Sequence, residues 1–76
     1  MSRKLPAVTG KEAARVAQQI GFEFRRQRGS HTIYVRPKDQ ARVVIPVHAG
    51  DVLKPKTLRG IIQDLKVSVE EFRKLL

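Results

Sequence analysis

The spacing of apolar residues changes twice along this chain of 76 residues, from helical to strand-like and back to helical. The first segment has apolar residues at offsets of 0, 3, 4 and 7, on one helix face: Ala13, Val16, Ala17 and Ile20. Thr9 and Glu12 have the spacing of a capping box, and Gly21 suits the position after a helix end. The sequence therefore predicts a helix between Thr9 and Gly21, preceded by a loosely held segment over residues 1–8.

The middle of the chain has the character of β-strands. Alternating or β-rich runs occupy residues 22–25, 31–36 and 42–47. Turn sequences separate them at residues 28–30 and 37–40. Pro46 lacks an amide donor, so we expect the third strand to lie at a sheet edge or to carry a bulge.

Alternation within the second run assigns Tyr34 to one face of the sheet and both Ile33 and Val35 to the other. We expect the β-branched pair on the core face. Tyr34 would then point away from the core, either to stack on an RNA base or as a half-exposed structural residue. The same parity puts His31 on the core side, unless twisting at the strand start turns it outward.

A helical pattern returns after residues 54–57, with the apolar residues Leu58, Ile61, Ile62 and Leu65. Ser68 and Glu71 form a second capping box before a short final helix. The predicted fold is α+β, of α-β-β-β-α order. A three-stranded antiparallel meander packs its helices on one face, as in double-stranded RNA-binding domains, and a short C-terminal helix follows. Residues 1–76 are expected to form a single domain, with any site shallow and on its surface.

Charge and composition narrow the choice of partner. Sixteen Lys and Arg against seven Asp and Glu give a net charge of +9, and the pI is near 11.0. A nucleic acid is the expected partner, ahead of an acidic protein or a membrane surface. The absence of cysteine excludes disulfides and a Cys-based zinc site and fits a reducing compartment, so we expect a cytoplasmic protein. We predict no signal peptide, membrane span, metal or cofactor, because the sequence has none of their patterns.

The run over residues 25–31 combines three arginines, a glycine turn and His31. Arginine makes forked contacts with phosphate, and histidine is the residue type that both accepts and donates protons near neutral pH. RNA carries its own nucleophile, the 2′-OH, so a base, an acid and nearby cations suffice to cleave it without a metal. His31 is thus a candidate catalytic residue; the alternative is an ordinary polar residue at a strand start.

Further candidates follow the third strand. His48 suits a second proton-transfer group or a phosphate contact, or else a residue that stabilises a turn. The start of the second predicted helix offers phosphate-binding groups and a hydroxyl that can cap the helix or contact RNA: Lys54, Lys56, Thr57 and Arg59. The full set of predicted RNA-binding residues is Arg26, Arg28, Ser30, Tyr34, Lys54, Lys56, Thr57 and Arg59.

These residues give the chain a resemblance to the HicA toxins of toxin–antitoxin systems. The matching stretches are Gly21-Phe22, residues 28–31, Ile33-Tyr34, residues 44–48, Leu53-Lys54, residues 57–59, Ile61-Ile62, Ser68 and Glu71-Phe72. The resemblance implies a double-stranded-RNA-binding-like fold and an mRNA-cleaving endonuclease that needs no metal. It also implies catalysis by His31 and a HicB-type antitoxin partner that covers the active site. Lys56 stands where the family often has glycine, and residues 66–68 lack the glycine that often precedes the last capping box.

Three hypotheses follow for function. The first is an mRNA-cleaving toxin that uses His31 as general acid/base and Arg26, Arg28 and Lys56 to stabilise phosphate. The second is a non-catalytic basic RNA-binding module that uses the same surface. The third is a protein whose charge serves only to dock an acidic partner. The first hypothesis predicts cleavage of RNA, and the second predicts salt-sensitive binding without cleavage. The third predicts no specific RNA affinity.

Overall fold

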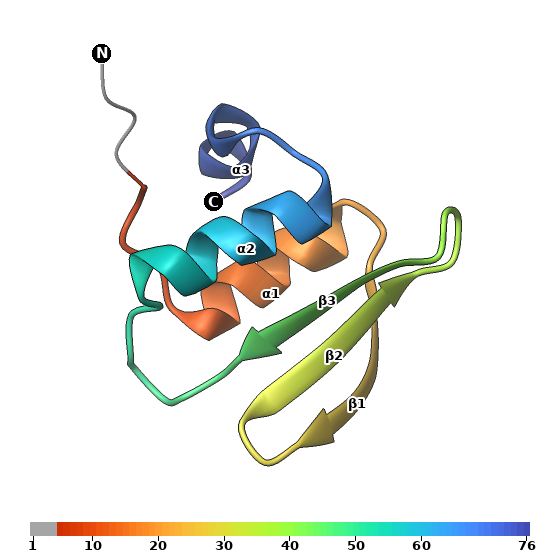
Figure 1. Cartoon of the computed structure of the whole chain (residues 1–76), viewed down its shortest axis with the longest axis horizontal. Helices are drawn as coiled ribbons and strands as arrows, with labels where there is room; N and C mark the ends of the chain where they lie inside the picture. The colour runs from red at the N-terminus through yellow and green to blue at the C-terminus, as the bar shows by residue number, and fades with distance from the viewer. Residues whose placement is uncertain (1–4) are drawn as a thin grey trace.

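The computed structural model describes residues 5–76. Its elements in chain order are α1 (Gly10–Gln19), β1 (Glu23–Arg28), β2 (His31–Arg36), β3 (Ala41–Pro46), α2 (Pro55–Leu65) and α3 (Val69–Leu75). The strands form one antiparallel sheet in the order β1-β2-β3, with the helices on one side of it (Figure 1). This confirms the predicted α+β order, the meander and the short final helix, and it is consistent with the double-stranded-RNA-binding-like fold. β3 is an edge strand, as Pro46 indicated.

Two of the three helices begin at a capping box that the sequence indicated. Thr9 and Ser68 accept hydrogen bonds from the amides of Glu12 and Glu71, at 3.2 and 3.0 Å, and each glutamate accepts one in return. The bonds from Ser68 lower the pKa of Glu71 below its usual range. At α2 the cap is Lys54, whose side chain makes no capping bond. The predicted cap role of Thr57 is wrong, because Thr57 lies inside the first turn of α2.

The core lies between the helices and the face of the sheet that carries Tyr34, Val43 and Ile45. The predicted alternation of the second strand is confirmed, but the expectation that the face of Ile33 and Val35 is the core face is wrong. Tyr34 is only 7% exposed within the core cluster, whereas Ile33, equally buried, lies outside that cluster on the opposite face. The run from Thr32 to Val35 is apolar or small on both faces, so its composition does not reveal which face is covered. We call the face turned away from the helices the open face.

The segment before α1 is held more firmly than predicted. Val8 is 1% exposed in the core, and its carbonyl accepts a 2.7 Å bond from the amide of Leu53. Thr9 also forms an isolated antiparallel bridge with Val52. The expectation of a loose segment is therefore wrong for residues 5–8, and residues 1–4 lie outside the described part of the chain.

A β-bulge in β1 decides which side chains reach the open face. Phe24 pairs with Tyr34, but Ile33, the preceding residue of β2, pairs with Arg26, so Arg25 is the extra residue of β1. Side chains directly opposite each other share a face. Arg26 and Arg28 therefore lie on the open face, although simple alternation from Phe24 would turn both of them towards the helices.

Asp39, in the turn between β2 and β3, ties that turn to both long helices. Its carboxylate accepts bonds of 3.0 and 2.9 Å from the Arg36 guanidinium and one of 3.4 Å from Lys66. Arg36 also donates to the carbonyl of Ile20 and lies 4.7 Å above the ring of Phe22. Lys66 adopts φ of 62°, a conformation that favours glycine, at the very segment where the sequence lacks the expected glycine.

We expect Asp39→Asn to lower stability in a pH-dependent way. The hydrogen bonds from Arg36 hold the pKa of Asp39 well below its ordinary value, which is about 3.9 in an unfolded chain. The resulting stabilisation is complete above that value and is lost as the pH falls towards the folded pKa. The urea midpoints of wild type and Asp39→Asn should therefore differ at pH 7 and converge below about pH 4. Asp64→Asn, which removes an exposed carboxylate with no ion pair among residues 5–76, is the control. A gap that stays constant down to the lowest pH would contradict this origin.

Candidate nucleic-acid interface

The start of β2 and the end of β3 bring the two histidine-containing stretches side by side. His31 lies opposite Arg28 on one side and Pro46 on the other. The amide of Val47 donates a 2.6 Å hydrogen bond to the carbonyl of Ser30. The sheet thus joins residues 28–31 to residues 46–48, which are separated in the sequence by two strands.

The close approach of α1 fixes the end of β3. Gly10, the first residue of α1, lies against the backbone of Pro46 and Val47. A Cβ atom at Gly10 would overlap the carbonyl oxygen of Pro46, so the approach requires glycine. The segment that leads to His48 is therefore held between the Ser30 backbone and the start of α1.

His31 is exposed, and the pairing of the strands puts it on the open face with Arg28. The expectation that parity would turn it towards the core is wrong, for the same reason that Tyr34 was misplaced. Arg26 lies opposite Ile33 and completes a cationic edge beside the histidine. The structure thus brings three of the predicted residues, His31, Arg26 and Arg28, onto one surface.

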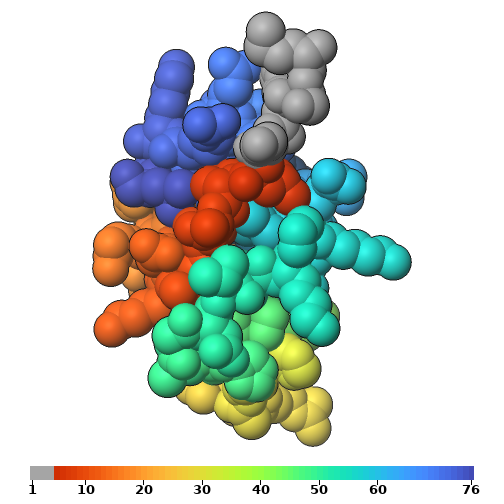
Figure 2. Space-filling view, turned by 90° about the vertical axis from the view of Figure 1, so that its left-hand side faces the viewer, coloured from red at the N-terminus to blue at the C-terminus, as the bar shows by residue number. Residues whose placement is uncertain are grey.

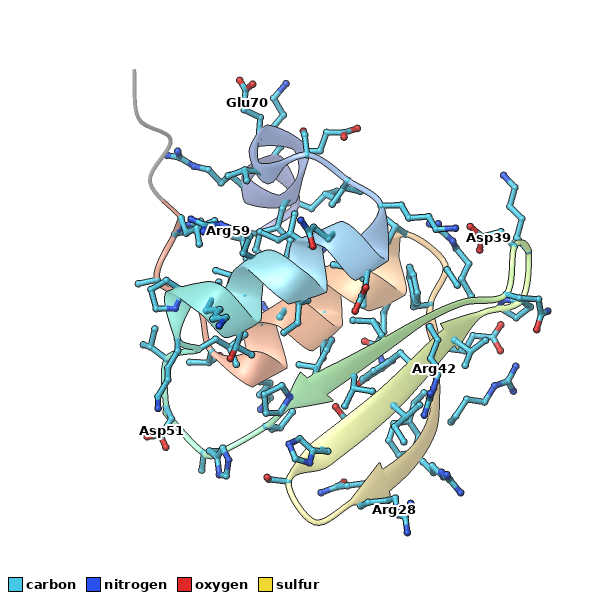
Figure 3. The ribbon with its side chains drawn as sticks, viewed as in Figure 1. Arg28, Asp39, Arg42, Asp51, Arg59 and Glu70 are labelled. Carbon is cyan, nitrogen blue, oxygen red and sulfur yellow. The ribbon has the colours of Figure 1, made fainter. Side chains whose placement is uncertain are left out.

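Arg42 is a member of this surface that the sequence reasoning missed. It pairs with Val35 and is exposed on the open face (Figure 3). Within the described part of the chain, Arg26, Arg28 and Arg42 form no ion pair or side-chain hydrogen bond, in contrast to Arg36. The available signal was the alternation of β3, where Arg42 is flanked by the buried Ala41 and Val43.

A shallow cavity of about 300 Å³ lies next to the open face, between the loop after β3 and the start of α2. Figure 2 shows this end of the molecule, where the β1–β2 hairpin, residues 46–53 and α2 meet. The cavity is lined by three of the predicted residues, His48, Lys54 and Thr57. Four other residues complete the lining: Pro46, Asp51, Val52 and Leu53. Pro46 belongs to this lining and is also the pairing partner of His31, so the cavity adjoins the histidine.

The remaining predicted residues lie elsewhere. Lys56 and Arg59 are exposed on α2 but do not line the cavity. Tyr34 packs in the core, where its ring meets that of Phe24 edge-on at 5.8 Å, so the predicted stacking of Tyr34 on a base from the open face has no geometric basis. Ser30 contributes its backbone carbonyl to the link with Val47.

Among residues 5–76, no three His, Asp or Glu side chains converge in a way that would hold a metal ion. No helix in the same range has the length and apolar character needed to cross a membrane.

The fold and this surface define a class: a small basic α+β protein with a cationic, solvent-facing sheet and an exposed histidine at its rim. The family model of the HicA toxin of bacterial toxin–antitoxin systems matches residues 10–67. The chain therefore belongs to the HicA toxin family, which confirms the resemblance found in the sequence. A search of curated proteins gave no match. The matched range contains every residue of the open face and the cavity, and it ends before α3.

Proposed function

We propose that this HicA-family protein is an endoribonuclease toxin that cleaves mRNA without a metal ion and uses His31 as general acid/base. The observation that carries the proposal is the placement of His31. It is exposed on the open face, directly opposite Arg28, and neither side chain is engaged by another group in residues 5–76. A single domain of residues 1–76, acting in the cytoplasm where mRNA is found, suits this activity.

The proposed reaction is an internal transfer followed by release. The 2′-OH attacks the adjacent phosphorus and loses its proton to a base, and the bond from phosphorus to the 5′-oxygen then breaks as that oxygen gains a proton. The products are a 2′,3′-cyclic phosphate and a 5′-OH. His31 is proposed to move one or both protons, while Arg26 and Arg28 stabilise the charge on the phosphorane.

His48 and the start of α2 supply the second part of the proposed site. The cavity that His48 lines adjoins the strand pair holding His31, so His48 suits either the second proton transfer or a phosphate contact. Lys54 and Thr57 share that lining and are proposed RNA contacts, together with Ser30. Lys56 and Arg59 are proposed to extend the cationic surface along α2.

A HicB-type antitoxin is the proposed protein partner. A net charge of +9 favours a partner with an acidic surface, and covering the open face would block access to His31. This proposal rests on membership of the family and on the charge.

The test is cleavage of an end-labelled single-stranded RNA in the presence of EDTA. We expect full activity in EDTA and fragments that end in a 2′,3′-cyclic phosphate, because the 2′-OH is the proposed nucleophile. Restoration of activity only by an added divalent ion would contradict the proposed chemistry, and so would fragments with 3′-OH ends. Binding without any cleavage would instead support the non-catalytic RNA-binding module.

A further inference from the structure

We infer that single-stranded RNA lies across the open face, from His31 towards Arg42, with its bases over Val44. This inference deepens the proposed function by naming the path and the strandedness of the substrate. Its new elements are Arg42, as a phosphate contact remote from the histidine, and an apolar centre between the cations.

The pairing of the strands arranges the open face in three cross-strand rows. The first row is Arg28, His31 and Pro46; the second is Arg26, Ile33 and Val44; the third is Glu23, Val35 and Arg42. Neighbouring rows are about 6.6–6.8 Å apart, because side chains on one face of a strand recur every second residue. An arginine in each row thus offers a contact to more than one phosphate of a strand that crosses the rows.

The third row gives this path a direction. Its carboxylate, Glu23, lies on β1, and its cation, Arg42, lies on β3. A polyanion is repelled by the first and attracted by the second, so the strand is expected to leave the arginines of β1 and cross towards β3. Arg42 is exposed and makes no ion pair with residues 5–76, so binding breaks no existing bond.

The centre of the open face distinguishes a single strand from a duplex. Val44 is 39% exposed, and Ile33, at 7%, lies outside the core cluster although it is apolar. A duplex hides its bases and would present mainly sugar and phosphate to these side chains, whereas a single strand offers base faces. Arginine side chains around the apolar centre can also stack their planes on bases.

The experiment measures binding rather than cleavage, so that it remains informative if the proposed catalysis is wrong. All variants carry His31→Ala to prevent cleavage, and the probe is a fluorescein-labelled single-stranded RNA of about 20 nucleotides, long enough to exceed a single-strand site of about 4–16 nucleotides. Arg42→Gln is compared with Arg73→Gln, a matched change on the exposed side of α3. Thermal melting followed by circular dichroism checks that both variants fold.

We expect Arg42→Gln to weaken binding about 5-fold and to reduce the slope of log K against log salt by about 0.7, the effect of one lost phosphate contact on a single strand. Arg73→Gln should leave both quantities unchanged. Equal affinities and slopes for the two variants would overturn the inferred path and leave the open face for a protein partner.

A second variant, Val44→Asp, tests strandedness. It should weaken binding of the single-stranded probe more than binding of the same sequence as a duplex, because only the single strand offers its bases to Val44. Equal loss on both probes would overturn the single-strand assignment. Cleavage by the parent protein, measured separately, decides the proposed function without reference to either result.

Discussion

Replacing His31 with alanine is expected to reduce the rate of RNA cleavage by about 10²–10⁴-fold, the usual contribution of a positioned general acid or base. RNA affinity should change little, because the cations that bind phosphate are separate side chains and supply most of the binding free energy. His31 is exposed and does not belong to the core, so folding should be preserved. Single-turnover cleavage in EDTA and fluorescence anisotropy measure the two quantities on the same RNA.

His48→Ala is the informative comparison. A loss as large as that of His31→Ala would indicate that both histidines transfer protons, whereas a smaller loss with weaker binding would indicate a phosphate contact. Undiminished cleavage by His31→Ala would remove His31 from the mechanism. His31→Ala, purified in the same way as the parent protein, also controls for a contaminating nuclease.

Replacing Phe72 with alanine is expected to lower the free energy of unfolding by about 3–5 kcal/mol. Phe72 is the buried residue of α3 and is 0% exposed, so its removal leaves a cavity where α3 packs on the core. The free energy of unfolding of globular proteins is about 0.05–0.15 kcal/mol per residue, so this loss is a large part of the stability of a chain this small. The melting temperature should fall by more than about 12 °C.

Leu76→Ala is the matched control, because Leu76 is apolar, 51% exposed and at the end of the same segment. Its effect should stay within about 0.5 kcal/mol. Urea unfolding monitored by circular dichroism gives both values. If Phe72→Ala were as mild as Leu76→Ala, then α3 would contribute little to the core, and residues 10–67 would carry the stability of the fold alone.

The sequence predicted those parts of the fold that depend on local chemistry. The capping boxes at Thr9 and Ser68, the turn glycines and the spacing of apolar residues act within a few positions, and their structures follow the predictions. Which face of the sheet the helices cover, and therefore whether Tyr34 is buried, could not be predicted from such local patterns. The reason is that β2 is apolar or small on both sides.

The candidate site was predictable in its residue types but less so in its arrangement. His31 and the arginines of β1 were found because a histidine beside clustered cations suggests chemistry on phosphate. Arg42 was missed because it stands alone in its strand, and its place on the open face depends on pairing with Val35. The junction of residues 28–31 with residues 46–48 likewise depends on the sheet, since no local pattern connects them.

The bulge at Arg25 absorbs one extra residue of β1 without changing the face on which Arg26 and Arg28 lie. Substituting Arg25 changes one side chain and keeps the count. Deleting Arg25 would place Arg26 directly after Phe24, and regular alternation would then still hold Arg26 and Arg28 on the open face. In the evolution of such a strand, the gain or loss of one residue at this point is therefore a small step for the charged surface, because the bulge takes up the difference and only the local bend of the strand changes.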